Sequence, residues 1–210
     1  MLARIQDPFQ CEGRTILTTR RKGRVIAGRL RSRGLILPYS DAIRPSSDIV
    51  KESVFNVLTN RFRLDFAQIG FFDIFAGSGA IGIEAISRMC SNVMFVDRSF
   101  EAIKCIRHNI TRLGIAEYST IIHGAIEQVN DEKITKFTEP FETSVIFLDP
   151  PYRQKAKITQ QIERFKRLQI GKLVIFVVET DSIEIPAIVE NRYIISHGSR
   201  NVMFLWSYKG

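Results

Sequence analysis

Short apolar runs alternate with longer amphipathic stretches from residue 70 to the C-terminus. Runs with the length and β-branched content of buried strands are found at 70–75, 93–96, 120–122, 145–148 and 173–178. Stretches whose apolar residues recur at helical spacing lie between them, at 81–89, 100–113, 125–129 and 158–168. Because strands and helices alternate, the pattern predicts a parallel sheet covered by helices on both faces.

The last two apolar runs, at 193–196 and 202–208, are separated by His197-Gly198-Ser199 and not by a helix. They are therefore predicted to form an antiparallel hairpin. A further amphipathic helix is predicted at 49–58, with Ser46 or Ser47 as its N-cap. The expected fold is α/β, with a seven-stranded, mostly parallel sheet that ends in the hairpin.

Basic residues are concentrated in the first fifth of the chain. Residues 1–44 carry ten basic and three acidic side chains, so +7 of the net charge of +8 lies there. Because apolar residues and glycines interrupt the basic ones around Val25-Ile26-Ala27, we predict a short β-hairpin in preference to a solvated tail. Such a segment suits a phosphate backbone. The candidate RNA contacts are Arg20, Arg21, Lys22, Arg24, Arg29, Arg31, Arg33 and, ahead of the 49–58 helix, Arg44.

Several classes of protein are not favoured by the composition. No apolar run approaches the roughly 18 residues that span a bilayer, and the N-terminus has no apolar leader. Cys11, Cys90 and Cys105 are scattered and odd in number, without metal-ligand spacing. We therefore expect free thiols in a reducing compartment, no membrane partner and no metal site.

A glycine-rich segment follows the first predicted strand of the alternating region. Gly77, Gly79 and Gly82 satisfy G-x-G-x-x-G between a strand and a helix, and Asp97 lies 20 residues after Gly77 at the end of the next strand. Glycines let the backbone approach a ligand, and the later acid can bind ribose hydroxyls. The pattern fits either NAD(H) or S-adenosylmethionine, whereas a purely structural turn is the simpler alternative.

The acid at the end of the first strand separates the two cofactors. Asp73 would repel a pyrophosphate, but it suits the ammonium group of a methionine moiety. An antiparallel last strand is also typical of methyltransferase sheets. S-adenosylmethionine is thus the expected cofactor.

A second chemical motif, Asp149-Pro150-Pro151-Tyr152, directly follows the apolar run at 145–148. Proline cannot continue a strand ladder, so the strand should stop here with an acid and an aromatic at its carboxyl end. Open α/β sheets bind their ligands at that edge. The alternative is a loop in which Asp149 caps a turn and Tyr152 packs on the surface.

Together these motifs resemble class I S-adenosylmethionine-dependent methyltransferases with a Rossmann-like fold. More narrowly, three segments look like the RsmD family of bacterial enzymes, which methylate N2 of a guanine in 16S ribosomal RNA. They are Arg24 to Arg29, the run from Arg44 to Glu52, and Asp73 to Arg88. The resemblance implies a catalytic domain at 45–210, a basic extension at 1–44, a monomer, and a bacterial cytoplasmic enzyme acting on the small ribosomal subunit.

The resemblance also implies roles for single residues. Asp149 and the Pro150 carbonyl would accept hydrogen bonds from the target amine, within the motif completed by Pro151, while Tyr152 would stack on the base. The cofactor would be held by Asp73, Phe75, Gly77, Ser78, Gly79 and Asp97. Two features depart from the family: residues 1–23 extend beyond the usual start, and Gly124 stands where an Asp or Asn usually contacts adenine. We expect backbone groups of Gly124 and Ala125 to make that contact.

Three other functions remain open from the sequence. An adenine-N6 methyltransferase acting on DNA or RNA would share the Asp-Pro-Pro-Tyr motif, but it usually carries a sizeable target-recognition domain. An NAD-dependent oxidoreductase would share the glycine loop, and Asp73 and Asp149 argue against it. A non-catalytic RNA-binding protein would share only the basic segment.

Overall fold

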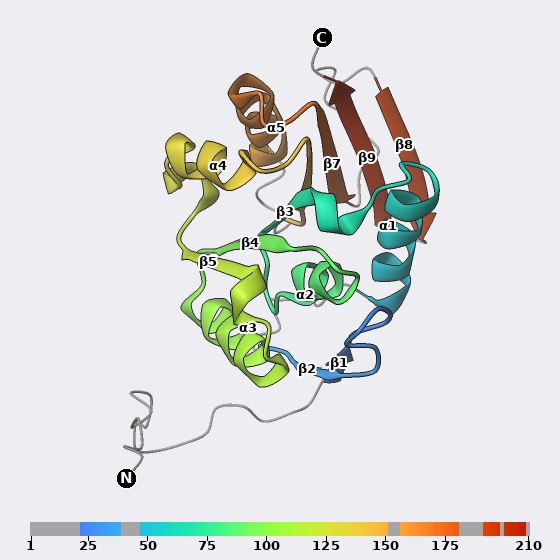
Figure 1. The fold of residues 1–210 in the computed structure, drawn as a ribbon, viewed down its shortest axis with the longest axis vertical. Helices are drawn as coiled ribbons and strands as arrows, with labels where there is room; N and C mark the ends of the chain where they lie inside the picture. The colour runs from blue at the N-terminus through green and yellow to red at the C-terminus, as the bar shows by residue number, and fades with distance from the viewer. Residues whose placement is uncertain (1–21, 39–46, 151–155, 181–190, 198–199, 209–210) are drawn as a thin grey trace.

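A computed structural model describes residues 22–38, 47–150, 156–180, 191–197 and 200–208. Its main sheet has seven strands in the order β5-β4-β3-β6-β7-β9-β8 (Figure 1). The strands are β3 (Ile69–Ile74), β4 (Asn92–Asp97), β5 (Ser119–His123), β6 (Thr143–Leu148), β7 (Leu173–Thr180), β8 (Asn191–His197) and β9 (Arg200–Tyr208). β3 to β7 run parallel, and β9 pairs antiparallel with both β7 and β8. The predicted sheet and its terminal hairpin are thus confirmed.

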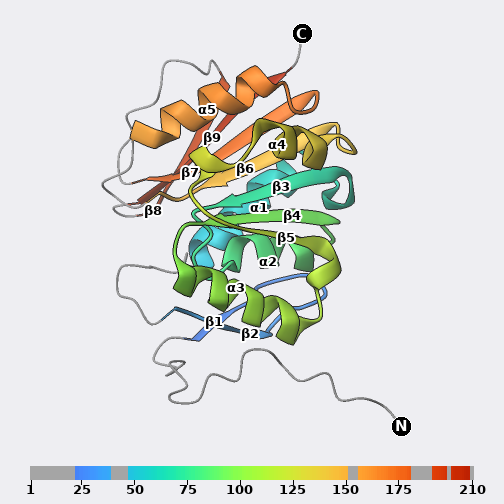
Figure 2. The same ribbon diagram turned by 90° about the vertical axis from the view of Figure 1, so that its left-hand side faces the viewer.

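Helices cover both faces of this sheet (Figure 2). The helices are α1 (Asp48–Asn60), α2 (Ala80–Ser87), α3 (Phe100–Leu113), α4 (Asp131–Thr138) and α5 (Ala156–Leu168). Two apolar clusters result, one beneath α1, α2 and α3 and the other beneath α4 and α5. Neighbouring residues of β3 show the division, because Phe71 packs in the first cluster and Phe72 in the second, and neither is exposed to solvent. Strands buried on both faces read as the continuous apolar runs seen in the sequence.

Among the helices, most predictions are correct, one is wrong and one helix was missed. Ser47 is the N-cap of α1, since its Oγ accepts from Val50 N at 3.2 Å. The short helix predicted at 125–129 is only a single 3-10 turn, Ile126–Gln128. α4 was not predicted, because its eight residues offer only Ile134 and Phe137 as apolar contacts. Other single 3-10 turns are Phe66–Gln68 and Ala116–Tyr118.

The predicted N-terminal hairpin is present, formed by β1 (Lys22–Arg24) and β2 (Gly34–Ile36). The strands lie outside Val25-Ile26-Ala27, which instead begins the connecting loop. Val25 and Leu35 are buried in the same apolar cluster as α1, α2 and α3. In Figure 2 the hairpin lies against α2 and α3. The domain boundary near residue 44 stays a prediction, and residues 1–21 lie outside the described chain.

Cys90 and Cys105 are buried free thiols, as predicted, whereas Cys11 lies outside the described residues. Burial raises the pKa of each thiol to about 12, so neither is a thiolate at neutral pH. Among the described residues, none of the helices has the length and apolarity to cross a membrane.

Candidate active site

Three acids predicted for the site lie at the carboxyl ends of three adjacent strands. β3 stands between β4 and β6, so Asp73 is aligned with Phe95 of β4 and Phe147 of β6. Asp97 is the last residue of β4, and Asp149 follows the last residue of β6. Adjacent strands are about 4.8 Å apart. The glycine-rich motif, which ends at Gly82, and the motif that begins at Asp149 therefore meet at one edge of the sheet.

The loop between β3 and α2 has an unusual backbone conformation. Phe75, Gly77 and Gly79 all have left-handed φ angles, of 62°, 55° and 76°. For Phe75 this conformation costs about 1–2 kcal/mol, and such strain is concentrated at functional sites. Hydrogen bonds from the N–H groups of Phe75 and Ala76 to the Val96 carbonyl hold the loop against β4. The loop is thus fixed in place before any ligand binds.

The third glycine of the motif serves packing. A Cβ on Gly82 would lie 2.3 Å from Cε1 of Phe95, so only glycine lets α2 approach the sheet this closely. Gly77 and Gly79 precede the helix and shape the loop, and Gly79 is its N-cap residue. The three glycines therefore divide into two for the loop and one for helix packing.

Asp97 fixes the glycine loop directly. Its Oδ2 accepts a hydrogen bond from Gly77 N at 2.8 Å, and its Oδ1 accepts one from Ser99 N at 2.8 Å. A carboxylate oxygen has two acceptor positions, so each can still receive a ribose hydroxyl. The ribose contact stays a prediction, and the structure adds a loop-positioning role that the sequence did not indicate.

Asp73 is almost completely buried, with 2% of its surface exposed. Its Oδ2 accepts from Gly82 N at 2.9 Å, a bond that anchors the first turn of α2. Burial, with the nearby Asp97 charge as a smaller cause, raises the pKa of Asp73 to about 7. A cation beside this carboxylate would stabilise its charged form, so the residue fits the ammonium group of the expected cofactor.

The Asp-Pro-Pro-Tyr motif is described only in its first half. Asp149 is half-buried and Pro150 buried at the end of β6. Pro151 and Tyr152 lie outside the described residues, as do Arg20, Arg21, Arg44 and the Lys22 side chain. The roles of all these residues stay predictions.

Gly124 lies beside the end of β4, where its N–H donates to the Asp97 carbonyl at 2.9 Å. The N–H of Ala125 donates to Oε1 of Gln128 at 3.2 Å. The N–H groups of both residues are thus already bonded within the protein. An adenine amino group needs an acceptor, so the predicted contact reduces to a backbone carbonyl of this segment.

The basic hairpin is anchored to the helix that follows the glycine loop. Glu84 of α2 is fully buried, and its carboxylate accepts from Ile26 N at 2.7 Å and from Ala27 N at 2.9 Å. Ser87 O accepts from Arg29 N at 2.8 Å, and its Oγ accepts from Leu30 N at 3.0 Å. An acid within the apolar run Ala80–Ser87 was the signal that could have revealed this contact.

Asn109 of α3 links the hairpin to the glycine loop. It is fully buried, and its Oδ1 accepts from Ile36 N at 2.9 Å. Its Nδ2 donates to the carbonyls of Ile36 and Ser78, at 2.9 and 3.2 Å. No sequence pattern pointed to this role, because Asn109, Ile36 and Ser78 are far apart in the chain. The described part of the hairpin is therefore held as firmly as the cofactor loop.

The tight contact of the hairpin with α2 leads to a first prediction. Gly28 has a φ of +78°, and a Cβ there would lie 2.0 Å from the Ser87 carbonyl oxygen. We expect Gly28→Ala to lower the free energy of unfolding by about 1–3 kcal/mol, as overpacked sites do. Gly34→Ala is the control, since the nearest atom to its added Cβ is 4.0 Å away. Urea denaturation measures both, and equal losses would contradict the packing argument.

The described arginines of the hairpin are exposed. Arg24 pairs with Asp48 at 2.9 Å, and the Arg29 guanidinium lies 4.4 Å from the centre of the Tyr118 ring. Arg31 and Arg33 are also exposed on the connecting loop. This loop contacts Ser87, the last residue of α2, whereas the glycine loop precedes the first. The basic loop and the candidate cofactor loop thus lie at opposite ends of α2.

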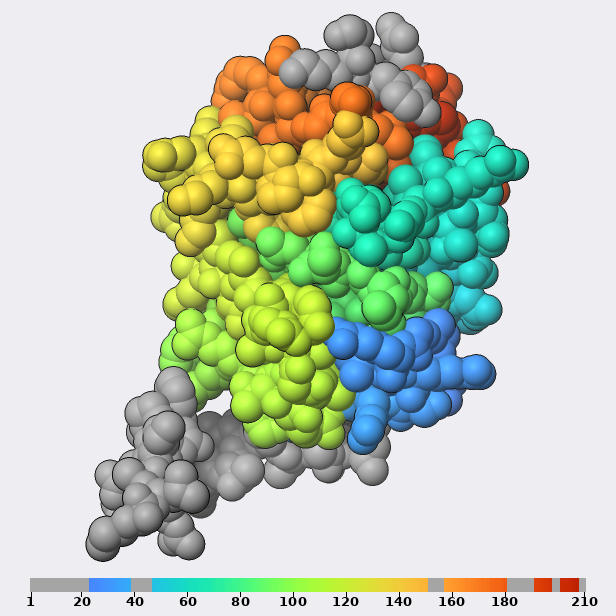
Figure 3. Space-filling model, viewed as in Figure 1, coloured from blue at the N-terminus to red at the C-terminus, as the bar shows by residue number. Residues whose placement is uncertain are grey.

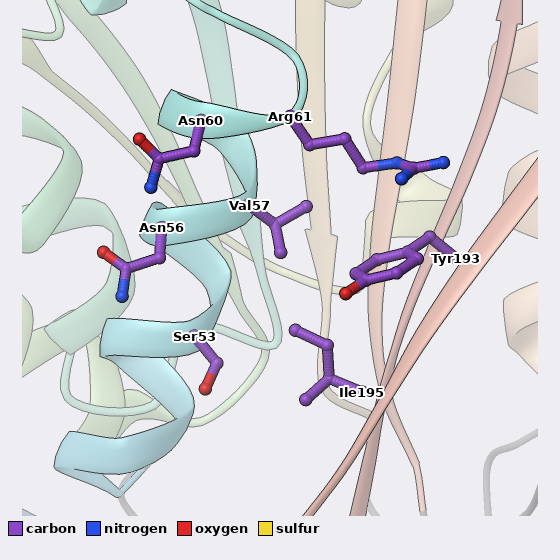
Figure 4. A pocket seen from close by; sticks show the side chains of 7 residues that line it. All are labelled: Ser53, Asn56, Val57, Asn60, Arg61, Tyr193 and Ile195. Atoms are coloured by element: carbon purple, nitrogen blue, oxygen red, sulfur yellow. The ribbon is translucent and has the colours of Figure 1, made fainter.

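A pocket of about 360 Å³ lies between α1 and β8, away from the sheet edge that carries Asp73, Asp97 and Asp149. It is lined by Ser53, Asn56, Val57, Asn60, Arg61, Tyr193 and Ile195. Figure 4 shows the Arg61 side chain reaching toward Tyr193, whose ring centre is 4.6 Å from the guanidinium carbon. β6, β7 and β9 separate β8 from β3, a distance of roughly 19 Å. The pocket is therefore separate from the glycine loop.

Comparisons with known proteins identify the family. The model of the family described as "Conserved hypothetical protein 95" matches residues 23–209. YlbH of Bacillus subtilis is 35% identical over 172 residues, which cover 79% of this chain and 87% of YlbH. Ribosomal RNA small subunit methyltransferase D of Haemophilus influenzae is 32% identical over 142 residues, which cover 65% and 68% of the two chains.

A solved structure with the same fold is that of the yhhF protein of Escherichia coli. It has a TM-score of 0.67 and 20% identity, and the match covers 90% of this chain and 99% of that one. The fold is that of class I S-adenosylmethionine-dependent methyltransferases, as the sequence predicted. The chain therefore belongs to the family of conserved hypothetical protein 95, which is the RsmD family that its motifs resemble.

Proposed function

We propose that this chain transfers a methyl group from S-adenosylmethionine to the exocyclic N2 amine of a guanine in 16S rRNA of the small ribosomal subunit. The observation that carries the proposal is the position of Asp149, at the end of the strand next to the one that leads into the glycine loop. S-adenosylmethionine is the cofactor that the class I fold implies, and one solved structure of this fold contains S-adenosylhomocysteine. A small-subunit rRNA substrate is supported by the name of the Haemophilus influenzae relative.

The glycine loop and the two acids beside it would each bind a different part of the cofactor. Asp73 would receive the ammonium group, and Asp97 the ribose hydroxyls. Gly77 and Gly79 let the backbone come close to the ligand, next to Phe75 and Ser78. When bound, S-adenosylmethionine supplies an electrophilic methyl carbon on a sulfonium. The fixed loop therefore determines where that carbon lies.

The exocyclic amine of guanine is a poor nucleophile, so the site must also activate it. The lone pair of an exocyclic amine is delocalised into the ring, so the amine must be turned and held. Asp149 and the Pro150 carbonyl would accept its two N–H groups, which localises the lone pair and aims it at the methyl carbon. As the new N–C bond formed and the bond between the methyl carbon and the sulfonium sulfur broke, the amine would lose a proton, which the Asp149 carboxylate would accept.

The basic hairpin would hold the RNA around the target base. Arg24, Arg29, Arg31 and Arg33 are exposed, and a planar guanidinium can grip phosphate through two hydrogen bonds. Tyr152 would stack on the extruded base with a gain of about 1–3 kcal/mol. A monomeric state and a cytoplasmic location are further expectations of this proposal.

Product identification tests the proposal. The wild-type chain is incubated with labelled S-adenosylmethionine and small-subunit RNA from cells that lack the modification, and the RNA is digested to nucleosides. Mass spectrometry should find N2-methylguanosine. N6-methyladenosine would favour the adenine enzyme instead. If no label is transferred although S-adenosylhomocysteine binds, the catalytic claim is wrong.

The role of Asp149 is tested by substitution. Asp149→Ala should lower kcat about a hundredfold, or roughly 2.7 kcal/mol of barrier, because it removes an acceptor that acts mainly in the transition state. Cofactor affinity should stay the same. Glu163→Ala, on the exposed side of α5, is the matched loss of one carboxylate away from the site. Undiminished transfer by a folded Asp149→Ala protein would exclude this role.

A further inference from the structure

The position of the basic hairpin leaves a gap in the proposed RNA contact. The hairpin loop is bonded to Ser87 at the end of α2, and the glycine loop lies before Ala80 at its start. Eight helical residues span about 12 Å. An RNA that touches both the hairpin loop and the edge carrying Asp149 must cross this distance. A surface that joins the two must therefore span it.

Helix α3 runs along this path. Phe100, its first residue, comes three residues after Asp97. The helix therefore begins at the catalytic edge, the edge of the sheet that carries Asp97 and Asp149. Near its other end, Arg112 donates to the Gly34 carbonyl of β2, and Asn109 is bonded to Ile36. Figure 2 shows α3 beside β1 and β2, and in Figure 3 the surface of α3 borders that of the hairpin. One helix thus connects the edge to the hairpin.

The outward side of α3 has the composition of a nucleic-acid contact. Phe100 is 55% exposed, with Lys104 Nζ 4.8 Å from its ring centre and the His123 ring centre 6.0 Å away. The other exposed residues of this side include Arg107, His108 and Arg112. Steps of four residues along a helix form a continuous ridge. From Phe100 through Lys104 and His108 to Arg112 this ridge is about 18 Å long.

We propose that this surface, the α3 ridge, is a second RNA contact that carries the substrate backbone from the catalytic edge to the hairpin. The α3 ridge comprises Phe100, Lys104, Arg107, His108 and Arg112. The inference rests on the proposed function and extends it. Cationic side chains bind phosphates, and an exposed aromatic beside them lets an unpaired base stack.

Charge on the helix supports RNA as the occupant. The exposed residues of α3 include three permanent cations and one acid, Glu101. Glu101 accepts from Ser99 Oγ at 2.9 Å, which fixes it at the first turn. Burial of the opposite side, with Ile103, Ile106 and Ile110, explains why the helix packs but not why its outer side is basic. The cations continue into Arg29, Arg31 and Arg33 of the hairpin.

Charge reversal with a matched control tests the α3 ridge. The variant is Lys104→Glu/Arg107→Glu, and the control is Lys133→Glu/Lys136→Glu on α4, which covers the other face of the sheet. All four side chains are exposed, and both variants change the net charge by the same amount. The affinity for a small-subunit rRNA fragment is measured at several salt concentrations, without methyl transfer.

The two variants should differ in both affinity and salt dependence. Loss of two phosphate contacts should reduce the slope of log K against log salt by about 1.4, since each contact to a single strand contributes roughly 0.7. Affinity should fall at least tenfold, while the control stays within about threefold of wild type. Equal behaviour of variant and control would overturn the proposal, as would a wild-type chain that binds no RNA.

A second variant separates stacking from charge. Phe100→Ala should weaken RNA binding about tenfold with the salt slope unchanged, because stacking releases no counterions. Unchanged affinity would remove Phe100 from the α3 ridge. Binding of S-adenosylhomocysteine by Lys104→Glu/Arg107→Glu should equal wild type, which shows that the site is folded. RNA binding without methyl transfer in wild type would contradict the proposed function and leave the α3 ridge supported.

Discussion

Replacing Glu84 with leucine is expected to lower the free energy of unfolding by about 3–5 kcal/mol. The carboxylate is fully buried, and it accepts hydrogen bonds from Ile26 N, Ala27 N and the Arg88 guanidinium. Leucine has similar volume but no acceptor, so two backbone N–H groups and a largely buried cation, 16% exposed, lose their partner together. Removing one member of a buried charged pair costs this much because the other charge remains unpaired.

Glu84→Gln is the control for this prediction. Glutamine keeps the shape of the side chain and one carbonyl acceptor, which can still accept from Ala27 N and the Arg88 guanidinium, whereas its amide nitrogen cannot accept from Ile26 N. Glu84→Gln should therefore lower the free energy of unfolding by less than Glu84→Leu does. Guanidinium denaturation gives the stability, and hydrogen exchange at the Ile26 and Ala27 amides reports whether the hairpin opens locally. If the Glu84→Leu and Glu84→Gln proteins had the same free energy of unfolding, and hydrogen exchange at the two amides were unchanged from wild type, the bonds from Ile26 N and Ala27 N to Glu84 would not hold the hairpin.

The fold was predictable from the sequence where one residue pattern decides one element. The β7 run Leu173–Val178 is apolar throughout, and α3 repeats its apolar residues at helical spacing. α4 was missed because its sequence is polar, and Ile134 and Phe137 are its only buried apolar residues. Strand formation at Val25 was also wrongly predicted. Its apolar side chain does enter the core, but the next two N–H groups bond to a carboxylate 57 and 58 residues away.

The candidate site was likewise predictable only in part. Asp73, Asp97 and Asp149 were found because the ends of parallel strands meet at one edge, a consequence of topology that sequence order reveals. Their partners could not be found. The bond from Asp97 to Gly77 depends on the path of a strained loop, and the link from Asn109 to Ser78 depends on helix packing. Neither leaves a pattern in the sequence.

The ionisation of Asp73 is expected to make the stability of the protein depend on pH. Burial raises the pKa of its carboxyl from 3.8 to about 7, so the folded protein holds this proton more tightly than the unfolded chain. Its contribution to stability is therefore fully present below pH 4 and is lost as the pH rises to about 7. The loss amounts to about 4 kcal/mol. Asp73→Asn keeps an acceptor for Gly82 N, so the free variant should be more stable than wild type at pH 8.

Binding of the cofactor product should show the opposite preference. The ammonium group of S-adenosylhomocysteine favours the charged carboxylate, so wild-type affinity should rise nearly tenfold per pH unit below 7 and level off above it. Asp73→Asn should bind more weakly at pH 8 and with little pH dependence in this range. Titration calorimetry from pH 5.5 to 8.5 measures both, with Glu132→Gln on the exposed side of α4 as the control. A flat wild-type profile would contradict the expected coupling between the ammonium group and an Asp73 carboxyl whose pKa burial raises into this range.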